Sequence, residues 1–141
     1  MSSTECYEQI AGKLGELHKH LRQLQSRMLE GYHISLMEYH ILAVVLKAEA
    51  VSQNELAQVL DVDKALISRQ IRVMEQKGLL SASEDPACRR KKLLTPSQQA
   101  WELIPELDEI HRQSLDRIFS DIDEKQLQNF QSVLEGLVSK L

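Results

Sequence analysis

The stretch SQNELAQVLDVDKALISRQIRVMEQKGLL, residues 52–80, limits most strongly what this chain can fold into. Its apolar residues recur at helical spacing on either side of Asp61-Val62-Asp63, which predicts two short amphipathic helices joined by a tight turn. Asp63 is suited to cap the second helix, because its carboxylate can accept from a backbone N–H that lacks a helical partner. Lys77-Gly78 is a typical helix ending, since glycine accepts a positive φ angle. The pattern therefore predicts a helix-turn-helix unit.

Positive charge is concentrated in the second of these helices and just after it. Residues 64–92 hold eight lysines and arginines against three acidic residues, a net charge of +5, so the rest of a chain whose total is −4 carries −9. A basic segment in an acidic chain indicates a local anionic partner, and the acidic remainder limits indiscriminate binding. The simpler alternative is a solvated charged face, because most charge runs are only that.

Helices are also predicted before this unit. A narrow apolar seam, in which each residue follows the last by three or four positions, predicts a first helix that ends at Gly31; the seam comprises Ile10, Leu14, Leu17, Leu21, Leu24 and Met28. Such a seam packs either against a second subunit or within its own subunit, and the sequence leaves both open. A second helix is predicted to begin at Ser35, where Glu38 completes a capping box, and Ser52 forms a similar box with Glu55.

The residues after Gly78 predict a hairpin and two further helices. Residues 79–95 are too interrupted for a helix, and two brief strands joined at Asp85-Pro86 fit them better. Thr95-Pro96-Ser97-Gln98 predicts a helix start with proline in the first turn, and Pro105 predicts a kink in that helix. A last helix is predicted from Asp123. The 141 residues show no linker or repeat, so we expect one domain, mainly α-helical.

The outer side of the second helix of the helix-turn-helix unit is suited to DNA. Such a helix enters the major groove with its N-terminal residues near the base edges. Arg69 is suited to a bidentate contact with guanine, Ser68 to a base or a phosphate, and Ala65 to close approach to a thymine methyl. Lys64 and Arg72 are better assigned to phosphates, which position the protein without specifying sequence.

The predicted hairpin adds four cations that are suited to a neighbouring minor groove or to the backbone. With them, the candidate DNA-binding residues are Gln53, Lys64, Ala65, Ser68, Arg69, Arg72, Arg89, Arg90, Lys91 and Lys92. Helix, turn, hairpin and charge all agree, which favours a DNA interface over a solvated charged face.

Residues 34–95 resemble the winged helix-turn-helix of the MarR family of transcription regulators. The resemblance is carried by ISLMEYHILAVVL, SQNELAQVLDVDKALISRQIRVMEQKGLL and RRKKLLTPSQQA. It implies a β-hairpin wing, and a homodimer joined through residues 5–31 and 96–141 that represses transcription at a near-palindromic operator. The family wing usually holds Asp and Arg close together, whereas here Pro86-Ala87-Cys88 separates Asp85 from Arg89.

The resemblance also implies a small-molecule effector, commonly anionic or phenolic, in the cleft between the dimer helices and the winged domain. The candidate lining residues are Tyr32, His33, Tyr39 and Trp101, which are equally suited to the core of an interface. The main alternative function is a winged helix that binds protein rather than DNA, such as an antagonist of a related repressor.

Other classes of function find little support. The sequence has no phosphate-cradling glycine loop, His-Glu-x-x-His or nucleophile elbow, so we expect neither an enzyme nor a cofactor. No two histidines are spaced i, i+4, so we expect no metal site. Cys6 and Cys88 form no disulfide framework. Cys6 has two acidic neighbours and is expected to be a passive thiol, whereas Cys88 lies among cations that favour its thiolate, so the sequence leaves a passive and a redox-sensitive Cys88 both open. The absence of a signal peptide and of any long apolar run indicates a cytoplasmic protein without a membrane partner.

Overall fold

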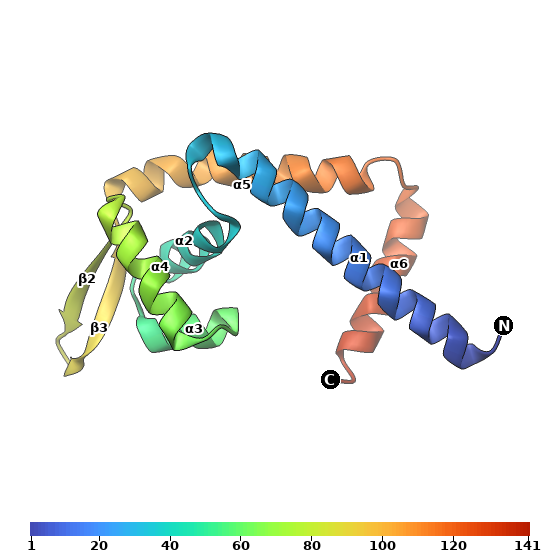
Figure 1. Ribbon diagram of the computed structural model, residues 1–141, viewed down its shortest axis with the longest axis horizontal. Coiled ribbons are helices and arrows are strands. Elements are labelled where there is room, and N and C mark those ends of the chain that lie inside the picture. The colour runs from blue at the N-terminus through green and yellow to red at the C-terminus, as the bar shows by residue number, and fades with distance from the viewer.

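The computed structural model describes the backbone of residues 1–141 and every side chain except that of Arg89. The elements in chain order are α1 (Ser3–Leu29), the 3-10 helix η1 (Glu30–Tyr32), α2 (Leu36–Ala48), β1 (Val51–Ser52), α3 (Gln53–Leu60), α4 (Lys64–Gln76), β2 (Leu80–Asp85), β3 (Cys88–Pro96), α5 (Gln98–Phe119) and α6 (Glu124–Val138). Figure 1 shows α2 to β3 gathered at one end of the molecule and α1 and α6 at the other, with α5 running along both. The predicted fold class, mainly α-helical with a small hairpin, is confirmed.

The helix-turn-helix unit is formed by α3 and α4, as predicted. Between them Asp61 adopts a left-handed conformation with a φ of 51°, and Asp63 Oδ1 accepts from the Ala65 N–H at 2.6 Å. Gly78, with a φ of 76°, follows the end of α4. The two helices pack on α2 through fully buried aliphatic side chains: Ile41, Leu42, Leu56, Ile67 and Met74. Burial of these residues fixes the face that α4 presents to solvent.

The hairpin of β2 and β3, which we call the wing, is also confirmed, and a short third strand joins it. The strands lie antiparallel in the order β1-β3-β2. Val51 pairs with Leu94, and Ser52 pairs with Leu93. The sequence analysis missed β1, because a strand of two residues is too short to show an alternating pattern.

Two predicted helix boundaries were wrong. Gly31 lies inside η1, and the left-handed residue that ends this segment is His33, with a φ of 55°. Pro96 is the last residue of β3 rather than part of the first turn of α5. The cap of α5 is Ser97, whose Oγ accepts from the Ala100 N–H at 3.1 Å, and α5 continues through Pro105.

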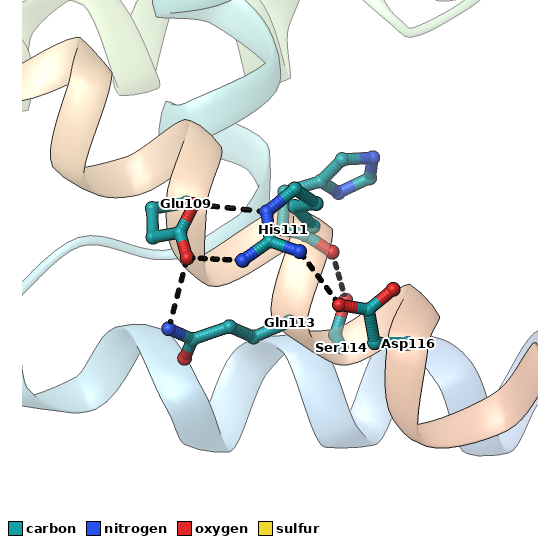
Figure 2. A network of polar contacts seen from close by, with 6 residues as sticks. Glu109, His111, Gln113, Ser114 and Asp116 are labelled. Carbon is teal, nitrogen blue, oxygen red and sulfur yellow. Dashed lines mark hydrogen bonds and ion pairs between the residues drawn. The ribbon is translucent and has the colours of Figure 1, made fainter. Parts of the chain in front are cut away.

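Exposed charged side chains pair along α5 beyond this proline. Arg112 donates to Glu109 and, at 2.7 Å, to Asp116 Oδ2, while Gln113 Nε2 donates to Glu109 Oε1 at 3.2 Å (Figure 2). Hydrogen bonds from Arg112 and Gln113 hold the pKa of Glu109 below its usual value. These contacts join residues three or four apart, so they support the helix itself and add little to tertiary stability.

Buried polar groups tie α1 and α2 to α5 between the two ends of the molecule. Gln25 Nε2 lies 3.3 Å from Ser114 Oγ and 3.1 Å from His111 Nδ1. Ser114 Oγ in turn donates to the His111 carbonyl oxygen at 2.6 Å (Figure 2). The Tyr39 hydroxyl donates to Asp108 Oδ1 at 2.7 Å, and burial together with this hydrogen bond raises the pKa of Tyr39. Contacts of this kind fix the crossing of the helices.

By contrast, the N-terminal part of α1 and the whole of α6 are poorly covered. Residues 1–24 and 124–138, all of them described, include none that is buried. The predicted seam of α1 is only half-buried, and Ile10 is 50% exposed. A hollow of about 650 Å³, lined by Ile10, Leu14, Leu17 and Phe130 among others, opens beside it. In the described part of the chain, no helix is long and apolar enough to span a membrane.

Candidate nucleic-acid interface

The outer face of α4 carries the five residues predicted on this helix. Lys64, Ala65, Arg69 and Arg72 are exposed, and Ser68 is half-buried at the edge of the face. The opposite face is formed by Ile67, Ile71 and Met74, which are buried. Because α4 is anchored by three apolar side chains and a cap at its first residue, its outer face is held in one orientation.

Strand pairing brings the wing to the start of α3. Ser52, the last residue of β1, pairs with Leu93 of β3, and α3 begins at the next residue, Gln53. The strands run antiparallel, so the chain before Leu93 passes the first turn of α3. The result is an open hollow of about 270 Å³, lined by Ser52, Gln53, Asn54, Arg90, Lys91 and Lys92, which we call the α3–wing hollow.

The electrostatics of the α3–wing hollow favour an anion. Three cations of the wing line it, and the first turn of α3 adds backbone N–H groups that lack helical partners. The N–H group of Glu55 is already used by the cap of α3, since it donates to Ser52 Oγ at 3.1 Å, so the N–H groups before it are those that face an anion. A phosphate oxygen is suited to such a place, because it can accept from backbone N–H groups while the lysines neutralise its charge.

The tip of the wing is closed by an acidic side chain. Asp85 Oδ1 accepts from the Ala87 N–H at 2.9 Å, so this carboxylate closes the turn between the strands. The pairing of β2 with β3 is shifted between Glu84, which pairs with Lys92, and Asp85, which pairs with Cys88. The side chain of Arg89, another predicted contact residue, lies outside the described part of the structure.

Two of the four candidate effector residues, Tyr32 and Tyr39, line different hollows. Tyr32 lines an open hollow of about 580 Å³ with Met28, Pro105, Glu106, Glu109, Ile110 and Gln113. Tyr39 is buried and lines a separate, smaller space beside Gln25 and Leu107. Trp101 is 44% exposed near the start of α5, and the His33 carbonyl oxygen accepts from Lys77.

Sequence reasoning missed three residues of interest. Ser52 and Asn54 line the α3–wing hollow beside Gln53, and Lys77 bonds to the segment between α1 and α2. A polar SQN triplet at a helix start and a basic segment forty residues later are visible in the sequence. The sequence does not show that these two segments lie close together, because their proximity depends on the pairing of a two-residue strand.

Comparisons with known proteins agree with this geometry. Residues 33–91 match the model of the MarR family. YdgG of Bacillus subtilis (strain 168), an uncharacterised HTH-type transcriptional regulator, is 28% identical over 110 residues, which are 77% of this chain and 72% of that protein. The transcriptional regulator BldR of Sulfolobus solfataricus has the same fold, with a TM-score of 0.84, 18% identity and full coverage of both chains. A cysteine-to-serine mutant of MarR from E. coli, complexed with operator DNA, has a TM-score of 0.84 and 13% identity, covering 97% of this chain and 99% of that one.

Proposed function

This chain is a winged-helix protein of the MarR family, and we propose that it is a transcriptional repressor that binds DNA sequence-specifically as a homodimer. The observation that carries the proposal is the presence of two surfaces suited to DNA in one winged helix. The outer face of α4 offers groups that read base edges, and the α3–wing hollow offers groups that hold a phosphate. A solved relative of the same fold is a complex with operator DNA.

The contacts divide by chemistry into those that specify and those that position. In the major groove, Arg69 is suited to guanine, Ser68 to a base or a phosphate, and Ala65 to a thymine methyl. Lys64 and Arg72 lie on the same exposed face and meet flanking phosphates. The remaining contacts come from the wing and the start of α3: Gln53, Arg89, Arg90, Lys91 and Lys92.

The uncovered helices support a homodimer. An apolar seam that is half-exposed along α1, and an α6 without a single buried residue, would leave a large apolar surface in water. A second copy of the chain covers both, because residues 5–31 and 96–141 of each subunit can pack against those of the other. Two α4 helices then face two half-sites about one helical turn, roughly 34–36 Å, apart, which predicts a near-palindromic operator.

A small-molecule effector is best placed in the hollow beside Tyr32. Its volume of about 580 Å³ lies within the usual range for ligand pockets, and its lining residues come from the end of α1, from η1 and from α5. Glu106 and Glu109 line it. Two carboxylates disfavour an anionic ligand, so a phenolic or cationic compound fits better than a carboxylate.

Selection of duplexes tests the proposed function directly. The purified protein is incubated with a random-sequence duplex library, and the bound fragments are sequenced after several rounds. We expect enrichment of an inverted repeat whose binding weakens steeply with salt. A winged helix that antagonises another protein predicts the opposite result: no enriched sequence and no salt-dependent binding to any duplex.

A further inference from the structure

We propose that Lys77 is a positioning residue for sequence recognition, fixing the C-terminal end of α4 to the segment that joins α1 to α2. This inference rests on the proposed function, because it concerns how accurately α4 is presented to DNA. Lys77 follows directly after the last residue of α4 and touches none of the residues assigned to DNA.

Two strong hydrogen bonds carry the proposal. Lys77 Nζ donates at 2.7 Å to Glu38 Oε2 in the first turn of α2. The same nitrogen donates at 2.7 Å to the main-chain carbonyl oxygen of His33, the left-handed residue where the segment from α1 ends. One ammonium group therefore joins the end of α4 to both sides of the junction between α1 and the winged helix.

Neither helix end needs this ammonium group for its own stability. Ser35 Oγ caps α2 by accepting from the Glu38 N–H at 3.1 Å. The Glu38 carboxylate, predicted to complete a capping box, instead accepts from Lys77. The last turn of α4 is closed by backbone bonds from the N–H groups of Lys77, Gly78 and Leu79. The side chain of Glu38 is 7% exposed and that of Lys77 is 34% exposed, and such a partly buried ion pair adds little net stability. The role of the ion pair between Lys77 and Glu38 is therefore to fix the orientation of α4 relative to α2.

A small rotation of α4 about its C-terminal end, where Lys77 lies, moves its N-terminal end by a much larger distance. Lys64 lies at the other end of α4, so the two ends are separated by about 20 Å at the helical rise. A rotation of α4 by ~5° about the Lys77 end displaces the base-reading end by roughly 2 Å, estimated from that length. A direct hydrogen bond does not survive such a shift. Phosphate contacts made by flexible lysines survive it, since long side chains can follow the backbone.

The experiment uses the full-length protein and two probes, the duplex enriched by the wild type and a scrambled duplex of equal length. The main variant is Glu38→Met/Lys77→Met, which removes both charges together and leaves no buried carboxylate unpaired. Lys77→Arg keeps a cation that can donate twice. Glu38→Lys/Lys77→Glu keeps an ion pair but loses the donor to His33. Lys47→Met, in the exposed last turn of α2 and outside the residues assigned to DNA or to the dimer, is the control for removal of a lysine.

We expect the ratio of enriched to scrambled affinity to fall at least tenfold in the double methionine variant. Its affinity for the scrambled duplex and its urea midpoint should stay at wild-type values. Lys77→Arg and Lys47→Met should retain the ratio, and the charge-swapped variant should lose it. A purely structural role predicts a lower urea midpoint and equal loss on both duplexes, and that pattern would overturn the proposal.

Two further results would also overturn it. An unchanged ratio in the double methionine variant would show that Lys77 does not position α4. If the charge-swapped variant kept the wild-type ratio of enriched to scrambled affinity, the ion pair would suffice and the contact with His33 would not contribute to positioning α4. Failure of the proposed function is distinguishable, because the wild type itself would then not discriminate between the two duplexes.

Discussion

Replacing Lys92 by alanine removes one cation from the α3–wing hollow and leaves the outer face of α4 unchanged. Lys92 is exposed on β3 and pairs across the wing with Glu84, an exposed neighbour whose loss costs little stability. If each Lys92 of the homodimer neutralises one phosphate, two contacts are lost and the slope of log affinity against log salt becomes smaller by about 1.8. Between about 50 and 200 mM salt, a fourfold range, the advantage of wild type over Lys92→Ala then shrinks by about twelvefold.

Fluorescence anisotropy titrations on the enriched and scrambled duplexes, at four or more salt concentrations, measure this slope. We expect Lys92→Ala to bind both duplexes more weakly by a similar factor, about 25-fold for two near-contact charge pairs in water, one from each subunit. Lys47→Ala changes the charge equally at a residue assigned neither to DNA nor to the dimer, in the exposed last turn of α2, and should keep the wild-type slope. Identical slopes for Lys92→Ala and wild type, or a loss confined to the enriched duplex, would refute the assignment of the hollow to a phosphate.

The remaining predictions test base reading, packing and pH dependence. Arg69→Ala should lose about 1–3 kcal/mol of binding at one base pair and relax preference there in a repeated selection; an unchanged preference would contradict its role. Ile67→Ala should lower the free energy of unfolding in urea by about 2–5 kcal/mol, because the side chain is fully buried. Val59→Ala, 66% exposed, should change it by less than about 0.5 kcal/mol, and similar values for the two would contradict the burial argument. Burial and the nearby Arg22 lower the pKa of His40, so its contribution to stability is complete above about pH 6.5 and is lost as the pH falls through the lowered pKa. His40→Gln should reduce the fall of the urea midpoint over that range, and an equal fall would contradict the assignment.

The sequence predicted the helix-turn-helix correctly because its signals are local. Asp63 caps α4 through a hydrogen bond to a residue two positions away, and Gly78 ends it through its own φ angle. Such signals depend on a few consecutive residues, so one sequence is enough to find them. The same holds for the wing, where Asp85 lies at the predicted turn between the two strands.

Features that depend on distant contacts could not be predicted. Glu38 has the spacing of a capping box, yet its carboxylate bonds to Lys77, thirty-nine positions away. The left-handed residue before α2 is His33 rather than the nearby Gly31, because the path of the chain into α2 decides where the turn falls. The α3–wing hollow exists only because a two-residue strand pairs with β3.

The apolar seam of α1 could be predicted in part from the sequence. Its spacing correctly predicted a helix with one apolar face, but periodicity alone cannot say what covers that face. The structure favours packing on a second subunit over packing within one subunit, since within one chain the seam is only half-buried and α6 has no buried residue. Coverage by a second subunit is therefore the premise of the proposed spacing between the two α4 helices.

The central claim is that two α4 helices, held at a fixed separation by α1, α5 and α6, bind two half-sites on one face of the duplex. It is tested most directly by titrating the protein with the enriched duplex and with one in which about five base pairs, half a helical turn, separate the half-sites further. The account predicts that the insertion lowers affinity to the level of the scrambled duplex. Undiminished affinity for the lengthened duplex would contradict it.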